Sequence, residues 1–218
     1  MKFSIDELTP AQQYKLMAAT LVPRPIAWVT TIDPGGGLNC GPFSFFNFFH
    51  GEPPVVALGI SGRAQHGALG QPGKDTLRNI LSSKEFVINL VSFDLRNEMN
   101  ITSIDFPPEE DELAAANLQV LPSDTVSPPR IADSPVSYEC RCFNTNNTGG
   151  GATLVLGHVQ MVHVRDDAVL DRSACYIDTA KLDLIGRMQG GGWYVRTSAL
   201  FRMPGLAMKE WKERESAG

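Results

Sequence analysis

Residues 38–56, LNCGPFSFFNFFHGEPPVV, combine aromatic rings with a Gly-Pro step and an isolated amide side chain. A strand that contains Gly41 and Pro42 leaves backbone N–H and C=O groups unpaired, while Asn39 and Ser44 offer short polar groups beside phenylalanine rings. Main-chain groups of this kind can bind a flat ring that has alternating donors and acceptors along one edge. The stretch therefore predicts the wall of a site for a flat ligand, and not only an apolar strand.

Residues 59–81, GISGRAQHGALGQPGKDTLRNIL, supply groups that suit a phosphate. They run from a predicted strand end through a Gly-rich loop to a helix start near Asp75, where backbone N–H groups add partial positive charge. The side chains in question are Ser61, Arg63, Lys74 and Thr76. Taken alone, such residues around a helix start serve more often as caps and solvated charges than as a phosphate site. Together, however, the two stretches favour an isoalloxazine ring against the strand and its phosphate tail in the loop.

Other catalytic and metal-binding patterns are missing from the sequence. No GxSxG or HExxH motif indicates a hydrolase, and no GxGxxG turn leads from a strand into a helix as in a dinucleotide-binding fold. Cys140 and Cys142 lie on one predicted strand face without a CxxC motif, and we interpret them as buried thiols rather than metal ligands. The histidines are interpreted as structural or surface residues: His50, His66, His158 and His163. We therefore expect no metal and no catalytic side chain.

The composition indicates a soluble protein with one sizeable core. Of 218 residues, 43% are hydrophobic, and 19 basic against 24 acidic residues leave a net charge of −5. No run of Lys or Arg occurs, which argues against nucleic acid as a partner. No segment approaches the about 18 uninterrupted apolar residues of a membrane span. We expect a cytoplasmic protein that binds neither nucleic acid nor membrane.

Strands dominate the predicted secondary structure. Thr9 and Pro10 are typical of a helix start, so a short helix is expected near the N-terminus. Apolar and β-branched segments bounded by turn residues predict strands at 25–32, 38–48, 53–60, 86–93, 136–144 and 152–164. Helices are expected at 75–85 and within 94–117. Because strands outnumber helices and do not alternate with them, the pattern predicts a β-barrel with inserted helices.

A series of ordered blocks carries a family resemblance across residues 20–205: RPIAWVTTID, NCGPFSFFN, KDTLRNI, FVINLV, SPVSYEC, LGHV and IGRMQGGGWY. With these blocks the sequence resembles the flavin reductase-like proteins that share the FMN-binding split barrel, and more narrowly their flavoredoxin-like branch. The resemblance implies an all-β dominated fold, a six-stranded antiparallel split barrel, in a homodimer with FMN near the subunit interface. It also implies three parts: an N-terminal helical extension (1–20), the split-barrel domain (21–205) and a C-terminal tail (206–218).

The same resemblance assigns the cofactor site residue by residue. The flavin ring would be lined by Asn39, Cys40, Gly41, Pro42, Phe43 and Ser44. Ribityl and phosphate oxygens would be held by Thr30 or Thr31 together with Ser61, Arg63, Lys74 and Thr76. Four more residues would lie close to the cofactor: Arg187, Gly190, Gly191 and Tyr194. Cys40 stands where this branch often has Ala, and the extra Gly in QGGGWY departs from the family pattern.

The resemblance implies hydride transfer from NAD(P)H to FMN. The cofactor supplies that chemistry and the protein supplies orientation, so no catalytic dyad is needed. The reduced flavin would serve a flavin-dependent monooxygenase or another electron acceptor. Two alternatives stay open: an FMN-binding electron carrier that does not use nicotinamide, and a dimeric barrel that has lost its cofactor.

Overall fold

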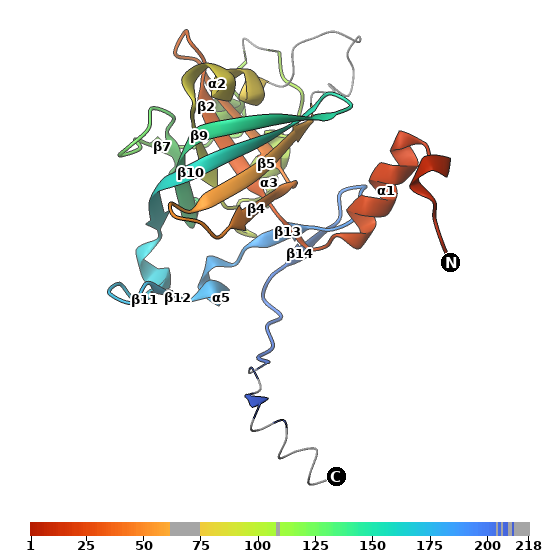
Figure 1. The fold of residues 1–218 in the computed structure, drawn as a ribbon. Coiled ribbons are helices and arrows are strands. Elements are labelled where there is room, and N and C mark those ends of the chain that lie inside the picture. Colours follow the sequence, from red (N-terminus) through yellow and green to blue (C-terminus); the bar gives the residue numbers. More distant parts are fainter. Residues whose placement is uncertain (62–74, 108–109, 204, 206, 209–210, 212–218) are drawn as a thin grey trace.

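The computed structural model describes residues 1–61, 75–107, 110–203, 205, 207, 208 and 211 (Figure 1). One antiparallel sheet of seven strands dominates it, in the order β3-β2-β6-β9-β10-β5-β4. Its strands are β2 (Ala27–Ile32), β3 (Leu38–Phe43), β4 (Phe46–Phe49), β5 (Val55–Ser61), β6 (Glu85–Asn89), β9 (Val136–Gly149) and β10 (Ala152–Val164). The expectation of a mostly β protein with a few helices is therefore confirmed.

The sheet curls into a barrel because its two edge strands are neighbours in the chain. β3 and β4 lie at opposite edges, yet only Ser44 and Phe45 separate them. The expectation of six strands was wrong, because the single strand expected at 38–48 breaks at this turn. There the carbonyl of Phe45 accepts a hydrogen bond from Gly59 N at 2.7 Å, which draws the chain onto β5. Pro42 has no N–H, so its place on an edge strand costs no sheet hydrogen bond.

The barrel interior is filled by apolar side chains. Residues of this core include Ala27, Val29, Leu58, Ile60, Ile80, Phe86, Ile88 and Val155. Gly157 is required by the close approach of Phe86, since a Cβ added there would lie 2.6 Å from Phe86 Cζ. Helix α2 (Asp75–Ser83) covers one end of the barrel with Leu77 and Ile80 (Figure 1).

A second apolar cluster lies on the outer face of β2 and β3, under two short helices, α3 (Arg96–Ile101) and α4 (Glu112–Ala115). It contains Trp28, Cys40, Met99, Leu113 and Ile185. The region 94–117 thus holds two separate helices, and α4 has its own N-cap. The Asp111 carboxylate accepts hydrogen bonds there from Leu113 N and Ala114 N at 2.8 and 3.2 Å.

Helix α1 (Pro10–Thr20) confirms the expected N-terminal helix. The Thr9 hydroxyl accepts a bond from Gln12 N at 3.4 Å and the Gln12 side chain accepts one from Thr9 N at 2.9 Å, which is a capping box. A small sheet follows beside it, made of β1 (Arg24–Pro25), β13 (Ile185–Arg187) and β14 (Tyr194–Arg196). The shorter elements are η1 (Ile5–Glu7), β7 (Val120–Leu121), β8 (Arg130–Ile131), η2 (Asp166–Ala168), β11 (Val169–Asp171), β12 (Tyr176–Ile177) and α5 (Thr179–Leu182). Among the described residues, no helix combines the length and the apolar character that a membrane span needs.

Candidate functional site

Polar side chains meet at the end of the barrel that α2 covers. Thr31 and Asn39 face each other across β2 and β3. The Asn39 Oδ1 atom accepts hydrogen bonds from the Thr76 hydroxyl at 2.7 Å and the Thr31 hydroxyl at 3.4 Å. Asn79 Nδ2 donates to Thr31 Oγ1 at 3.1 Å, while Asn79 Oδ1 is buried and has no hydrogen-bond partner among the described residues. The structure therefore brings together three of the residues predicted to bind the cofactor, and adds Asn79.

Glu112 on α4 belongs to the same network, although sequence reasoning did not find it. Its Oε1 atom accepts a hydrogen bond from Asn39 Nδ2 at 2.7 Å, and its Oε2 atom accepts one from Cys40 N at 3.3 Å. Burial raises the pKa of the Glu112 carboxyl above its usual value, against the opposing effect of hydrogen bonds from its own N–H, Cys40 N and Asn39. The contact orients the Asn39 amide so that its oxygen faces Thr31 and Thr76.

Two residues assigned to the site point away from this network. Cys40 is fully buried in the second apolar cluster, and burial together with the charges of Glu112 and Asp111 raises the pKa of its thiol well above the usual value. Thr30 donates its hydroxyl hydrogen to the carbonyl of Pro129 at 2.5 Å. Because side chains alternate along a strand, only one of these two neighbours can face the polar network, and that residue is Thr31.

Other residues predicted to bind the cofactor belong to β3, to the end of β5 and to the segment that follows β5 in the sequence. A Cβ at Gly41 would lie 3.6 Å from the Phe43 ring and 3.7 Å from Thr76 Oγ1, so the strand backbone runs beside the polar network. Phe43 itself packs into the barrel core. Ser61 ends β5 as an exposed residue opposite Ala152. Arg63 and Lys74 lie outside the described residues.

A second group of predicted residues lies on the β13–β14 hairpin, below the barrel in Figure 1, whereas α2 lies above it. The Arg187 guanidinium donates to the Tyr194 hydroxyl, and its carbon lies 4.6 Å from the centre of the Tyr194 ring. No atom of the described residues lies within 4 Å of the place that a Cβ at Gly190 would take, and Gly191 has a φ of 72°, which favours glycine. The predicted site residues thus form two groups, with β3 between them.

Arg24 connects this hairpin to the turn between β3 and β4. It is buried, and it donates to the carbonyl of Met188 at 2.7 Å and to the carbonyl of Ala18 at 2.6 Å. Its guanidinium carbon lies 5.6 Å from the centre of the Phe45 ring. Sequence reasoning missed this residue because two of its partners, Phe45 and Met188, lie far from it in the sequence.

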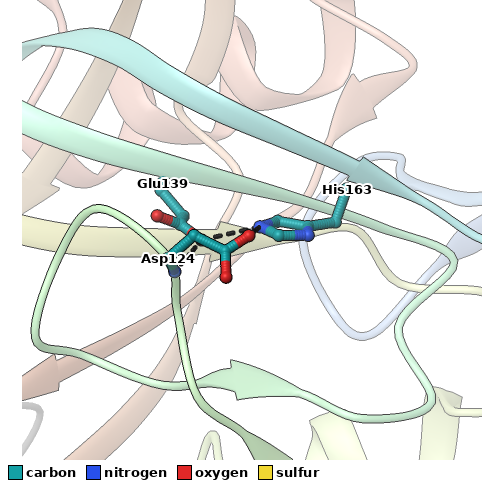
Figure 2. A group of neighbouring side chains, drawn as sticks. All are labelled: Asp124, Glu139 and His163. Atoms are coloured by element: carbon teal, nitrogen blue, oxygen red, sulfur yellow. Dashed lines mark hydrogen bonds and ion pairs between the residues drawn. The ribbon is translucent and has the colours of Figure 1, made fainter.

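A third polar group, also missed, joins Asp124, Glu139 and His163 on the barrel wall (Figure 2). His163 Nε2 lies 2.6 Å from Glu139 Oε1 and 3.9 Å from Asp124 Oδ2. The fully buried Glu139 also accepts bonds from Asp124 N at 2.8 Å, Thr125 N at 2.6 Å and the Thr125 hydroxyl at 2.5 Å. Burial opposes the Glu139 charge, yet these bonds outweigh it and lower its pKa from 4.5 to about 2. With both carboxylate oxygens already bonded, the group fastens the loop at 124–125 to β9 and β10.

A barrel curled from one antiparallel sheet, whose edge strands are joined by a two-residue turn, defines the protein as a split barrel. Residues 17–180 match the sequence model of the flavin reductase like domain. The chain therefore belongs to the flavin reductase-like family, which confirms the resemblance seen in the sequence.

Relatives and solved structures agree with this assignment. An uncharacterized protein of Deinococcus radiodurans is 41% identical over 219 residues, which cover 99% of this chain and 94% of the relative. The structure of the 2-nitrobenzoate 2-nitroreductase NbaA of Pseudomonas fluorescens matches with a TM-score of 0.85 and 27% identity, covering 95% of this chain and 98% of that one. Nitrilotriacetate monooxygenase component B of Bacillus cereus matches with a TM-score of 0.84 and 27% identity, covering 93% and 98%.

Proposed function

We propose that the protein binds FMN and transfers a hydride to it from NAD(P)H. The observation that carries the proposal is the network of Thr31, Asn39 and Thr76 beside the start of α2, in a chain of the flavin reductase-like family. Uncharged hydroxyl and amide groups of this kind suit the ribityl oxygens of a flavin nucleotide. The donor set of the chain therefore fits the cofactor.

The two groups of residues would hold different parts of FMN. Thr31, Asn39 and Thr76 would bind its ribityl chain, and the phosphate would lie toward Ser61, Arg63 and Lys74. The ring would lie along β3 from Gly41 to Ser44, with Arg187 and Tyr194 of the hairpin nearby. Cys40 would not touch it, because its buried side chain faces the other side of the strand.

The chain has to orient two rings and exclude water, and it needs no acid or base. FMN, when bound, would supply the ring that accepts a hydride. The hydroxyl and amide side chains of Thr31, Asn39 and Thr76 carry no charge, and Glu112 contacts Asn39 as a positioning residue. A thiolate role for Cys40 does not fit its raised pKa.

We propose a homodimer as the working form. Phe48 and Phe49 on the edge strand β4 are 56% and 55% exposed, and Trp193 on the hairpin is 63% exposed. Aromatic residues gathered beside a ligand site are typical of surfaces that a second subunit covers. Phe48→Asp should therefore convert a dimer to monomers in analytical ultracentrifugation. A wild-type protein that sediments as a monomer at micromolar concentration would contradict this proposal.

A flavin-dependent monooxygenase is the acceptor that we propose for the reduced flavin. The support is the likeness to nitrilotriacetate monooxygenase component B, whose name describes one component of a monooxygenase. Reduced flavin made by this protein would pass to the oxygenase component.

The experiment that tests the function has two steps. Purified protein should be yellow or turn yellow with added FMN, and should release FMN on denaturation. Oxidation of NADH or NADPH should then be followed at 340 nm with FMN as the acceptor. Steady oxidation supports a reductase. Tight FMN binding without nicotinamide oxidation would instead identify an electron carrier, and absence of FMN binding would overturn the proposal.

A further inference from the structure

A cleft of about 280 Å³ lies between α3 and the β13–β14 hairpin. Its apolar floor contains Met99 and Ile185, which are 2% and 5% exposed and belong to the second apolar cluster. Asn97 and Asn100 on α3 line one wall, and Tyr194 lines the other. Its volume suits a single ring system with one attached group, rather than a whole dinucleotide.

Positive charge gathers around the aromatic ring at one end of this cleft. The guanidinium carbons of Arg96 and Arg196 lie 4.1 and 4.4 Å from the centre of the Phe93 ring. Asp183 neutralises Arg196 through two bonds, of 2.5 and 2.6 Å, and Asp94 also lies near it.

Arg96 keeps donor groups for a ligand. It donates Nη1 to the carbonyl of Phe93 at 2.7 Å, and within the described residues no carboxylate pairs with it. Stacking on Phe93 holds its planar guanidinium in one orientation, so that its remaining N–H groups form a fixed fork. Such a fork suits phosphate and carboxylate oxygens.

Tyr194 connects the cleft to the proposed flavin site. The residue lines the cleft on one side, and it also lines a hollow of about 400 Å³ with Met188 and Trp193. Its hydroxyl contacts Arg187, which we place near the flavin ring. An elongated ligand could therefore hold one end at the flavin and the other in the cleft.

We infer that this cleft binds a flat aromatic ring carrying an anionic group, supplied by the adenylate end of NAD(P)H. The inference rests on the proposed function, because the adenylate belongs to the nicotinamide donor of the proposed reaction. The adenine would lie on the apolar floor beside Asn97 and Asn100, and a phosphate would accept hydrogen bonds from Arg96. A free aromatic carboxylate has the same chemistry and is the competing source of the ligand.

Isothermal titration with 5′-AMP and with benzoate separates these sources. The wild type should bind 5′-AMP, and Arg96→Gln should weaken binding about tenfold to a hundredfold, as expected for a lost charge-assisted contact. Arg172→Gln is the matched control, because Arg172 is an exposed arginine in the turn between β11 and β12. Binding of benzoate without 5′-AMP, or of neither, would overturn the adenylate assignment.

Kinetics supply a second readout. In Arg96→Gln, the ratio of KM for NADH to KM for reduced nicotinamide mononucleotide, which lacks the adenylate, should rise by a similar factor. Asn100→Ala, at an exposed position on α3, should shift the ratio in the same direction and protects the test against misfolding of the first variant. An unchanged ratio in both folded variants would overturn the inference.

Failure of the inference and failure of the function give different results. NADH oxidation with normal FMN binding but without 5′-AMP binding would overturn the inference about the cleft and would still support the proposed reductase function. Binding of 5′-AMP without any nicotinamide oxidation would support the ligand class of the cleft and overturn the proposed function. Equal loss of FMN and 5′-AMP affinity in Arg96→Gln would place the cleft within the flavin site and overturn the inference.

Discussion

Glu112 on α4 holds the side chain of Asn39 on β3, with Glu112 Oε1 accepting from Asn39 Nδ2 at 2.7 Å. The other carboxylate oxygen accepts from Cys40 N, so one side chain satisfies an edge-strand N–H and also sets the orientation of an amide. Through Asn39, the orientation extends to the hydroxyls of Thr31 and Thr76. A residue outside the proposed binding surface thus controls the geometry of that surface.

Removal of the Glu112 carboxylate should weaken flavin binding. In Glu112→Ala, the Asn39 amide loses its charged acceptor and can rotate, so we expect the Kd for FMN to rise about tenfold, the effect of one charge-assisted hydrogen bond. Fluorescence titration of FMN measures the change. Glu110→Ala, at an exposed position nearby in the chain, is the control and should bind as the wild type does. Unchanged affinity in Glu112→Ala would exclude Asn39 from the site.

Lys74 and Thr76 should affect flavins in different ways. If Lys74 pairs with the phosphate as proposed, Lys74→Ala removes a charged partner, so the Kd for FMN should rise roughly tenfold to a hundredfold while riboflavin, which has no phosphate, binds almost as before. Thr76→Val acts through Asn39, because the Thr76 hydroxyl donates to Asn39 Oδ1, so FMN and riboflavin should weaken together. Calorimetric titration of both ligands decides this. If Lys74→Ala weakens FMN and riboflavin binding equally, Lys74 does not contact the phosphate and is a solvated charge.

Gly157 should not tolerate a side chain. A Cβ at this position would lie 2.6 Å from Phe86 Cζ, inside the barrel core, so Gly157→Ala should lower the free energy of unfolding by about 1–3 kcal/mol through overpacking. Urea denaturation measures the loss. Phe86→Leu relieves the contact, so the double variant should be less destabilised than the sum of the single variants. If the changes in the free energy of unfolding of the two single variants simply add, then atoms other than Phe86 move to make room for the added Cβ.

Glu139 should make stability depend on pH in the acidic range. Its folded-state pKa of about 2 lies below the ordinary 4.5, so its stabilisation is present above about pH 4.5 and is lost as the pH falls toward 2. The shift corresponds to a contribution on the order of 3 kcal/mol for this buried group.

Urea denaturation between pH 7 and pH 3 tests the contribution of Glu139. Glu139→Gln should be less stable than the wild type at pH 7, and the difference should shrink as the pH falls below 4.5. Glu110→Gln, an exposed control, should follow the wild-type curve. A constant difference across the range would show that shape, and not charge, makes Glu139 important.

The sequence by itself determined the features that depend on short-range interactions. Thr9, Pro10 and Gln12 specify the start of α1, because capping acts within one turn of helix. Alternating apolar residues and turn chemistry predict most of the barrel strands, since each strand must bury one face. The ordered motifs identified the family, and they named Asn39 and Thr76 as candidate cofactor residues together with Thr30 or Thr31.

Only the tertiary structure decided how distant segments meet. Curling the sheet so that its edges join places Phe45 against β5, which splits the expected strand at 38–48 into β3 and β4. Glu112 reaches Asn39 across 73 residues, and no local pattern marks that pairing. The bond from Arg24 to Met188 and the cleft beside Arg96 likewise depend on elements that lie far apart in the sequence. Such contacts follow from the packing of the whole chain, because a side chain's partner is set by three-dimensional position and not by spacing along the sequence.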